Sequence, residues 1–175
     1  MIGYKATYKG ICLNQLYEVG EIYTLDGELV MCENGFHFCQ DLYDVFNYYL
    51  PNKNIKVFKV EALGNIKTKG DKSVTDKIKI LEEVDLSNMI VEKNGYKKYF
   101  DNNKNYVKEK LPDDSFYKYE YDKRGNLIKY EHSDGYCMKY EYDENDNVIK
   151  CENAYGNYVK NYYDGNNKCI KVERG

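Results

Sequence analysis

The side chains outside the repeats that could do chemistry gather in residues 34–40, whose sequence is Asn-Gly-Phe-His-Phe-Cys-Gln. His37, Cys39 and the nearby Cys32 offer the nitrogen and sulfur ligands that zinc prefers. A structural zinc site needs four ligands; Cys12 is the candidate for the fourth, but the chain has neither a C-x-x-C nor an H-x-x-x-H pair. We therefore predict no metal site, and we expect a partly buried His37 that bonds to the backbone.

The other acidic, hydroxyl and imidazole side chains form no recognisable catalytic set. Glu82 and Glu83 are adjacent, and adjacent residues of a strand point to opposite faces, so this pair is not placed for joint acid–base chemistry. The serines lack the glycine context of a nucleophile elbow, and His132 falls in a repeat. The sequence predicts no catalytic triad.

The composition is that of a soluble folded chain: of 175 residues, 42% are hydrophobic, 31% are charged and two are proline. The net charge of −3 lacks the basic footprint of a nucleic-acid-binding protein, so that partner is disfavoured. No apolar run approaches the roughly 18–20 residues that span a bilayer, and the first residues do not resemble a signal peptide. We predict a cytoplasmic protein without a membrane partner, whose six cysteines are reduced.

Residues 95–175 repeat with a period of 21 residues in four copies. The register is set by four equivalent pairs: Phe100-Asp101, Tyr121-Asp122, Tyr142-Asp143 and Tyr163-Asp164. Along residues 117–121, tyrosine alternates with Lys118 and Glu120, which predicts a half-buried strand. Turn residues around Gly125 and Gly135 predict that each unit is a β-hairpin. Because one hairpin cannot bury its aromatic face alone, the copies are expected to stack.

The first 94 residues contain no repeat, and their pattern mixes strands with helices. Strands are expected at 4–8, 35–39, 55–62 and 77–84, with a hairpin across 25–28. Asp41 as N-cap and an apolar stripe before Pro51 predict a helix over 41–50, and 85–91 is expected to form a second short helix. The predicted fold is an α+β N-terminal domain over 1–94, followed by an all-β array of four 21-residue β-hairpin repeats over 95–175.

The repeats resemble the tyrosine-aspartate (YD, or RHS-type) repeats of bacterial and phage proteins, through motifs such as Tyr121-Asp122-x-x-Gly125-Asn126. Long arrays of that family form β-rich shells around toxin cargo, and four copies are too few to enclose any. The resemblance therefore implies the local hairpin fold. A weaker likeness links the array to hairpin repeats that bind cell-wall choline or glucans, whose pockets usually use Trp, which this chain lacks.

Residues 1–84 resemble an uncharacterised family found in phages and low-GC bacteria, through the motif Gly35-Phe36-His37-Phe38-Cys39 among others. That resemblance implies a phage or mobile-element origin and assigns no activity. The same motif, with the helix expected after it, also resembles the core of the ADP-ribosyltransferases, in which such a strand and helix frame the nicotinamide pocket.

The transferase resemblance implies NAD as cofactor and a set of site residues. Lys5 would lie where that family carries its NAD-anchoring residue, and His37 would take the aromatic position. The catalytic glutamate would be Glu61, Glu82 or Glu83. The chain departs from the family in having no Arg before Arg124, since Lys5 lacks the planar fork that grips a pyrophosphate.

Our sequence-based interpretation is a non-catalytic binding module that needs no cofactor. We expect the repeats to present a tyrosine-rich face to a protein partner. As a phage-type protein, the chain would bind and block a host or defence protein. The residues expected to contact the partner are Tyr119, Tyr121, Tyr140, Tyr142 and Tyr163. Two alternatives stay open: an NAD-using ADP-ribosyltransferase-like enzyme with the repeats as its target-recognition arm, and homo-oligomers paired through hairpin edges.

Overall fold

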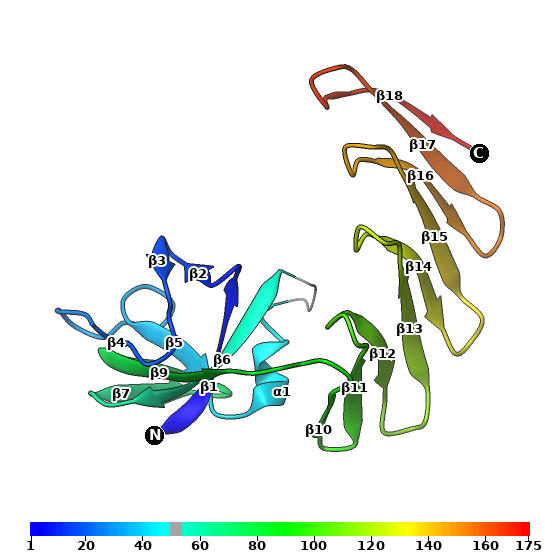
Figure 1. Ribbon diagram of the computed structural model, residues 1–175. Helices are drawn as coiled ribbons and strands as arrows, with labels where there is room; N and C mark the ends of the chain where they lie inside the picture. Colours follow the sequence, from blue (N-terminus) through cyan, green and yellow to red (C-terminus); the bar gives the residue numbers. More distant parts are fainter. Residues whose placement is uncertain (50–53) are drawn as a thin grey trace. The chain divides into compact units, whose positions relative to one another are not determined.

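The computed structural model describes residues 1–49 and 54–175, and the chain divides into two compact units (Figure 1). The first unit comprises Met1–Val91 and Asn102–Lys104, and the second comprises Glu92–Asp101 and Asn105–Gly175. Each unit is built on one antiparallel sheet. None of the helices in the described residues has the length and apolar character needed to cross a membrane.

The sheet of the first unit has the strand order β4-β9-β6-β1-β5-β8-β7, and the short strands β2 and β3 extend from β1. The strands are β1 (Ile2–Tyr8), β2 (Ile11–Cys12), β3 (Gln15–Leu16), β4 (Ile22–Thr24), β5 (Phe36–Cys39), β6 (Ile55–Ala62), β7 (Ile66–Lys69), β8 (Lys72–Thr75) and β9 (Lys77–Glu83). The central strand β1 pairs with β6 on one side and with β5 on the other. Strands distant in sequence therefore meet at the centre of this sheet.

The expectation of an α+β N-terminal domain is wrong, because the described part of the first unit has one helix of four residues, α1 (Leu42–Val45). Asp41 is its N-cap and accepts the backbone N–H of Tyr43 at 2.8 Å. After α1 the chain tightens into turns, since Asn47 donates to the carbonyl of Asp44, three residues back. The apolar residues that suggested ten residues of helix lie instead partly in α1 and partly in these turns. The expected end at Pro51 lies outside the described residues.

Two further expectations for local structure are also wrong. The helix expected over 85–91 is a loop that leads into a strand, β10 (Ile90–Lys93). The hairpin expected across 25–28 does not form, because β4 pairs instead with β9, more than fifty residues later. At residues 25–28 a long-range strand pairing overrides a local signal, whereas Ile90–Lys93 pairs with the strand that follows it in the chain.

The core of the first unit lies on the side of the sheet that carries the even-numbered residues of β6. Its buried members are Tyr17, Phe38, Phe58, Val60, Ala62, Ile78 and Ile80. Two glycines allow the close packing at its margin. A Cβ atom at Gly3 would lie 2.4 Å from the ring of Phe38, and one at Gly35, whose φ is +129°, would lie 2.3 Å from Val74. No other residue type fits these positions without displacing a neighbour.

The second unit is a single sheet in which nine strands follow one another in sequence order (Figure 1). They are β10, β11 (Tyr96–Phe100), β12 (Tyr106–Lys110), β13 (Phe116–Tyr121), β14 (Leu127–His132), β15 (Cys137–Tyr142), β16 (Val148–Asn153), β17 (Tyr158–Tyr163) and β18 (Cys169–Arg174). We call this sheet the array. Asn94 and Gly95, both with positive φ, form the turn between β10 and β11.

The Tyr-Asp motif has a structural role in the three hairpins that carry it; the first repeat has Phe100-Asp101 instead. The Tyr121 hydroxyl donates to the carbonyl oxygen of Tyr106 at 2.8 Å, fifteen residues earlier. The same bond recurs from Tyr142 to Leu127 and from Tyr163 to Val148. The aspartate of the motif caps the turn that follows: in the second repeat, for example, Asp122 accepts the backbone N–H of Asn126 at 2.9 Å. The tyrosine thus ties a hairpin to the preceding one, and the aspartate shapes its own turn.

Candidate functional site

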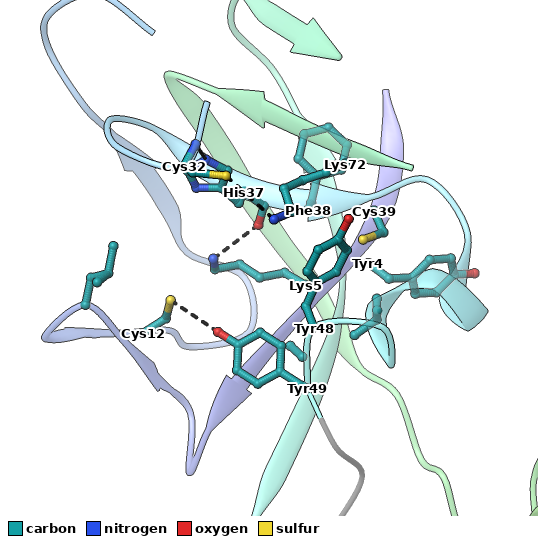
Figure 2. A pocket seen from close by; sticks show the side chains of 13 residues that line it. Tyr4, Lys5, Cys12, Cys32, His37, Phe38, Cys39, Tyr48, Tyr49 and Lys72 are labelled. Carbon is teal, nitrogen blue, oxygen red and sulfur yellow. Dashed lines mark hydrogen bonds between the residues drawn. The ribbon is translucent and has the colours of Figure 1, made fainter. Parts of the chain in front are cut away.

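The first unit contains a cavity of about 350 Å³ next to β1, β5 and α1 (Figure 2). Its cationic or titratable basic side chains are Lys5, His37 and Lys72. Its aromatic and sulfur-bearing residues are Tyr4, Phe38, Tyr48, Tyr49, Cys12, Cys32 and Cys39. None of the described residues that line it is acidic. The cavity is therefore electropositive and partly aromatic.

Lys5 is a buried basic residue on the central strand β1, with only 4% of its surface exposed. Its ammonium group donates to the carbonyl oxygen of His37 at 3.2 Å and lies 4.9 Å from the centroid of the Tyr17 ring. Burial lowers the pKa of Lys5, and a hydrogen bond to the Cys12 thiol opposes this effect. Within residues 1–49 and 54–175, no carboxylate forms an ion pair with it. The groups that favour its protonated form are the His37 carbonyl, the Tyr17 ring and Cys12.

His37 is half-buried, and its Nε2 accepts the backbone N–H of Cys32 at 2.7 Å. This bond is the backbone contact expected from the sequence, and it occupies one of the two ring nitrogens that can bind a metal. Burial lowers the pKa of His37, and the nearby charges of Lys5 and Lys72 lower it further. In the part of the chain that the structure describes, no group of three or more His, Cys, Asp or Glu side chains is placed to hold a metal ion.

Two tyrosines from the turns after α1 also line the cavity, Tyr48 beside Lys72 and Tyr49 beside Cys12 (Figure 2). The Lys72 ammonium lies 3.7 Å from the ring centroid of Tyr48 and 3.7 Å from the Cys32 sulfur. A hydrogen bond to Asp71 raises the pKa of Tyr48 to about 12. Burial raises that of Tyr49 to about 12, and its hydroxyl lies 3.6 Å from the Cys12 sulfur. Both phenols are therefore neutral at physiological pH.

The glutamates of the transferase interpretation do not line the cavity. Lys5 pairs with Phe58 in the β1–β6 ladder, and Glu61 follows Phe58 by three residues, so Lys5 and Glu61 point to opposite faces of the sheet. Glu82 forms an ion pair with Lys59 at 3.3 Å. The structure brings Lys5 and His37 to one cavity and leaves both glutamates outside it.

The second candidate site is a group of rings on one face of β12–β15, which we call the aromatic cluster. Its members are Tyr106, Tyr117, Tyr119, Tyr130, His132 and Tyr136. Tyr119 lies between Tyr106 and Tyr130, with ring centroids 4.9 and 5.6 Å away. Tyr117, Tyr119 and Tyr130 are partly exposed. The array offers a continuous aromatic surface over neighbouring hairpins.

The five tyrosines expected to contact a partner divide into two kinds. The hydroxyls of Tyr121, Tyr142 and Tyr163 are used in the bonds that tie hairpins together. Tyr119 belongs to the aromatic cluster, and Tyr140 occupies the same position one repeat later, opposite Cys151. Tyr130 was missed by the sequence analysis. Its signal is the hairpin register, which places it directly across from Tyr119.

The opposite face of the array is charged and locally balanced. Lys118 pairs with Glu131 across one hairpin and with Lys108 across the neighbouring strand. Lys129 contacts the carboxylates of both Glu120 and Glu131, at 3.4 and 2.6 Å. Equivalent contacts of Lys150 with Glu141 and Glu152 recur one repeat later. This face therefore mixes lysines with carboxylates, and pairs of lysines lie opposite each other between neighbouring hairpins.

Comparison with known protein families identifies the first unit. A domain of unknown function (DUF7666) matches residues 1–92, and the chain belongs to this family. No curated protein matches the chain.

Proposed function

We propose that the chain is a non-catalytic binding protein whose array holds a protein partner on the aromatic cluster. The observation that supports the proposal is a one-layer sheet with partly exposed rings on one face. A sheet normally buries its apolar face against a second layer of structure. In the second unit, all of whose residues are described, no second layer is present. A partner would supply that layer for Tyr117, Tyr119 and Tyr130.

Tyrosine suits this task for physical reasons. Its ring buries a large area while losing few rotamers, and its hydroxyl can bond a polar partner atom. The phenols of the cluster are held in place before binding, because each of Tyr119 and Tyr130 contacts other rings. Burial raises the pKa of Tyr119, so its hydroxyl stays protonated and can donate. A pre-organised aromatic patch of this kind loses little entropy when it binds.

The charge pattern favours a protein over a nucleic acid. Nucleic-acid affinity depends on lysines and arginines that are free to neutralise phosphates. On the array, Lys129 and Lys150 are engaged by glutamates on the charged face. The net charge of the whole chain is −3. These features support a partner with mixed polar and apolar surface.

The resemblance to phage and mobile-element proteins supports a biological role for this binding. We infer a cytoplasmic protein that acts by occupying the surface of a host or defence protein. Blocking by binding needs no catalytic group, which agrees with the separation of Lys5 and His37 from Glu61 and Glu82.

Photo-crosslinking from the two faces of β13 tests the proposal in the full chain. Tyr119 is replaced by the photoreactive p-benzoylphenylalanine in one variant, and Lys118 in the matched control. These neighbours point to opposite faces of the same strand. After irradiation in a host-cell extract, we expect a discrete protein adduct from position 119 and not from position 118.

The adduct should also disappear when Tyr130→Ser removes the ring across from position 119. Circular dichroism of this variant verifies that the array is folded. Adducts of equal yield from both faces, or none from position 119, would contradict the proposal. Adducts only from position 118 would assign binding to the charged face instead.

A further inference from the structure

The cavity of the first unit is lined by basic side chains, and partner binding by the array does not explain this composition. It is lined by two lysines and a histidine without an acidic residue among the described lining positions. A buried ammonium without a carboxylate is energetically unfavourable in a folded protein. A group of this kind either loses its proton, as the lowered pKa of Lys5 favours, or keeps it when a ligand of opposite charge completes the site.

Lys5 and Lys72 converge on the same part of the cavity. Lys5 donates to the carbonyl of His37, and the Lys72 ammonium lies 3.7 Å from the sulfur of Cys32. Cys32 in turn donates its N–H to the imidazole of His37. Within the described residues, neither lysine forms an ion pair with a carboxylate. The two cations thus flank the His37–Cys32 contact from two strands, β1 and β8.

The rest of the lining suits a flat apolar body. Tyr48 and Tyr49 come from the turns after α1, and Phe38 from the strand before it. The volume of about 350 Å³ falls at the lower end of the range of roughly 300–1,000 Å³ typical of small-molecule sites. A ligand of this size could place a ring beside the tyrosines while its charged group reaches the lysines.

We propose that this cavity binds a small organic anion with a planar ring, whose phosphate or carboxylate group is held by Lys5 and Lys72. Ring contact with Tyr48 and Tyr49 would supply the apolar part of the affinity. His37 is a positioning residue, because its carbonyl orients Lys5 and its ring fixes the backbone at Cys32. The site is independent of the aromatic cluster and of the proposed partner.

A matched pair of fluorescent probes tests the role of charge. 8-Anilinonaphthalene-1-sulfonate is an aromatic anion, and N-phenyl-1-naphthylamine has the same ring system without the sulfonate. In the full chain we expect the anionic probe to bind saturably at one site. Lys5→Met should lower the affinity of that site for the anionic probe about tenfold or more. The Lys72→Met variant should show a smaller loss in the same direction, and the neutral probe should bind all three proteins alike.

The control variant is Lys69→Met, on the exposed strand β7 of the same unit. It removes one positive charge without touching the cavity, so it reveals any general effect of net charge. Lys5→Met is expected to fold, since methionine fills similar space without a buried charge, and circular dichroism checks this. Lys72→Met, at a partly exposed position, keeps the test valid if Lys5→Met does not fold.

Competition then identifies the anionic group. Displacement of the anionic probe by adenosine monophosphate but not by benzoate assigns a phosphate, and the reverse assigns a carboxylate. Displacement by neither at millimolar concentration overturns the proposal. Equal affinity of the anionic probe for wild type, Lys5→Met and Lys72→Met also overturns the proposal. So does a loss of affinity for the neutral probe as large as the loss for the anionic probe.

Discussion

The two units of this protein solve the problem of burying apolar area in different ways. In the first unit, β1 pairs with β5 and β6, and a core of residues such as Val60, Ile78 and Ile80 is completely shielded from solvent. In the array, each strand pairs with its neighbours in sequence, and most side chains are only partly buried. The first unit depends on long-range contacts, whereas the array depends on contacts repeated every 21 residues.

This difference determines where each unit can tolerate change and where it can hold a ligand. A shielded core requires exact fit and can enclose a cavity, so its sites are internal. A one-layer sheet has no interior, so its binding sites, including a hollow of about 400 Å³ beside Lys150 and Lys160, lie on its faces. The three predictions below test that contrast, from the largest expected effect to the smallest.

Adding one methyl group should separate the two kinds of packing. Gly35→Ala places a Cβ atom 2.3 Å from Val74 at a φ of +129°, so we expect a loss of about 3 kcal/mol or more in unfolding free energy. Gly165→Ala in the array meets no atom within 4 Å and should change stability by less than about 0.5 kcal/mol. Urea unfolding with hydrogen-exchange readout for each unit measures both. Equal losses would show that the array is packed as tightly as the first unit.

The start of the array is an exception to this contrast, because it contains a buried ion pair. Lys98 lies 2.7 Å from Glu109, and the two side chains are only 10% and 19% exposed. Removing one partner of such a pair leaves a buried charge, so Lys98→Met should destabilise the array by about 3 kcal/mol. Lys129→Met, in a more exposed pair, should remove less than about 1 kcal/mol.

The double variant Lys98→Met/Glu109→Leu supplies the control for this prediction. It removes both charges and should recover most of the stability. Thermal unfolding of the single and double variants gives the comparison. If Lys98→Met and Lys129→Met have equal effects, the first hairpins of the array are no more buried than the later ones.

The smallest expected effect is a pH dependence confined to the first unit. Because the pKa of His37 is lowered in the fold, the unfolded chain takes up a proton first as pH falls below about 6.5. The stability associated with neutral His37 is therefore present above that pH and is lost as pH falls toward the folded pKa. We expect His37→Gln to flatten this pH dependence of the unfolding free energy between neutral pH and pH 5.

Glutamine keeps an acceptor for the Cys32 N–H, so this variant tests charge rather than the hydrogen bond. His132→Gln in the array is the matched control and should leave the pH dependence of the first unit unchanged. Unfolding midpoints measured from pH 5 to pH 8 provide the test. An unchanged slope in His37→Gln would show that another group is responsible.

The sequence predicted some local features because their causes are local. The N-cap role of Asp41 follows from its short acidic side chain before an apolar segment. The strand over Ile55–Ala62 follows from its β-branched and aromatic residues. The backbone-bonded state of His37 was anticipated from the lack of a fourth metal ligand, and the bond itself joins residues only five apart.

The helix over 41–50 and the hairpin across 25–28 were wrong because local preference there is weak. An apolar stripe fits a helix and a series of turns about equally well, and contacts with β1 and β5 decide between them. Residues such as Tyr23 had no local signal that their partner is Ile78 in β9. The α+β expectation failed for this reason.

The sequence alone determined the period of the array and the places where its turns occur, because each repeat carries its own turn residues and contacts its neighbours in the chain. The tertiary structure alone decided that Lys5 meets Lys72 at one cavity, and that Glu61 is excluded from it. It also placed Tyr130 across from Tyr119 in the aromatic cluster. The physical reason is that side chains far apart in sequence meet only through strand pairing and register, and a register shift of one residue would reverse the face on which each of them lies.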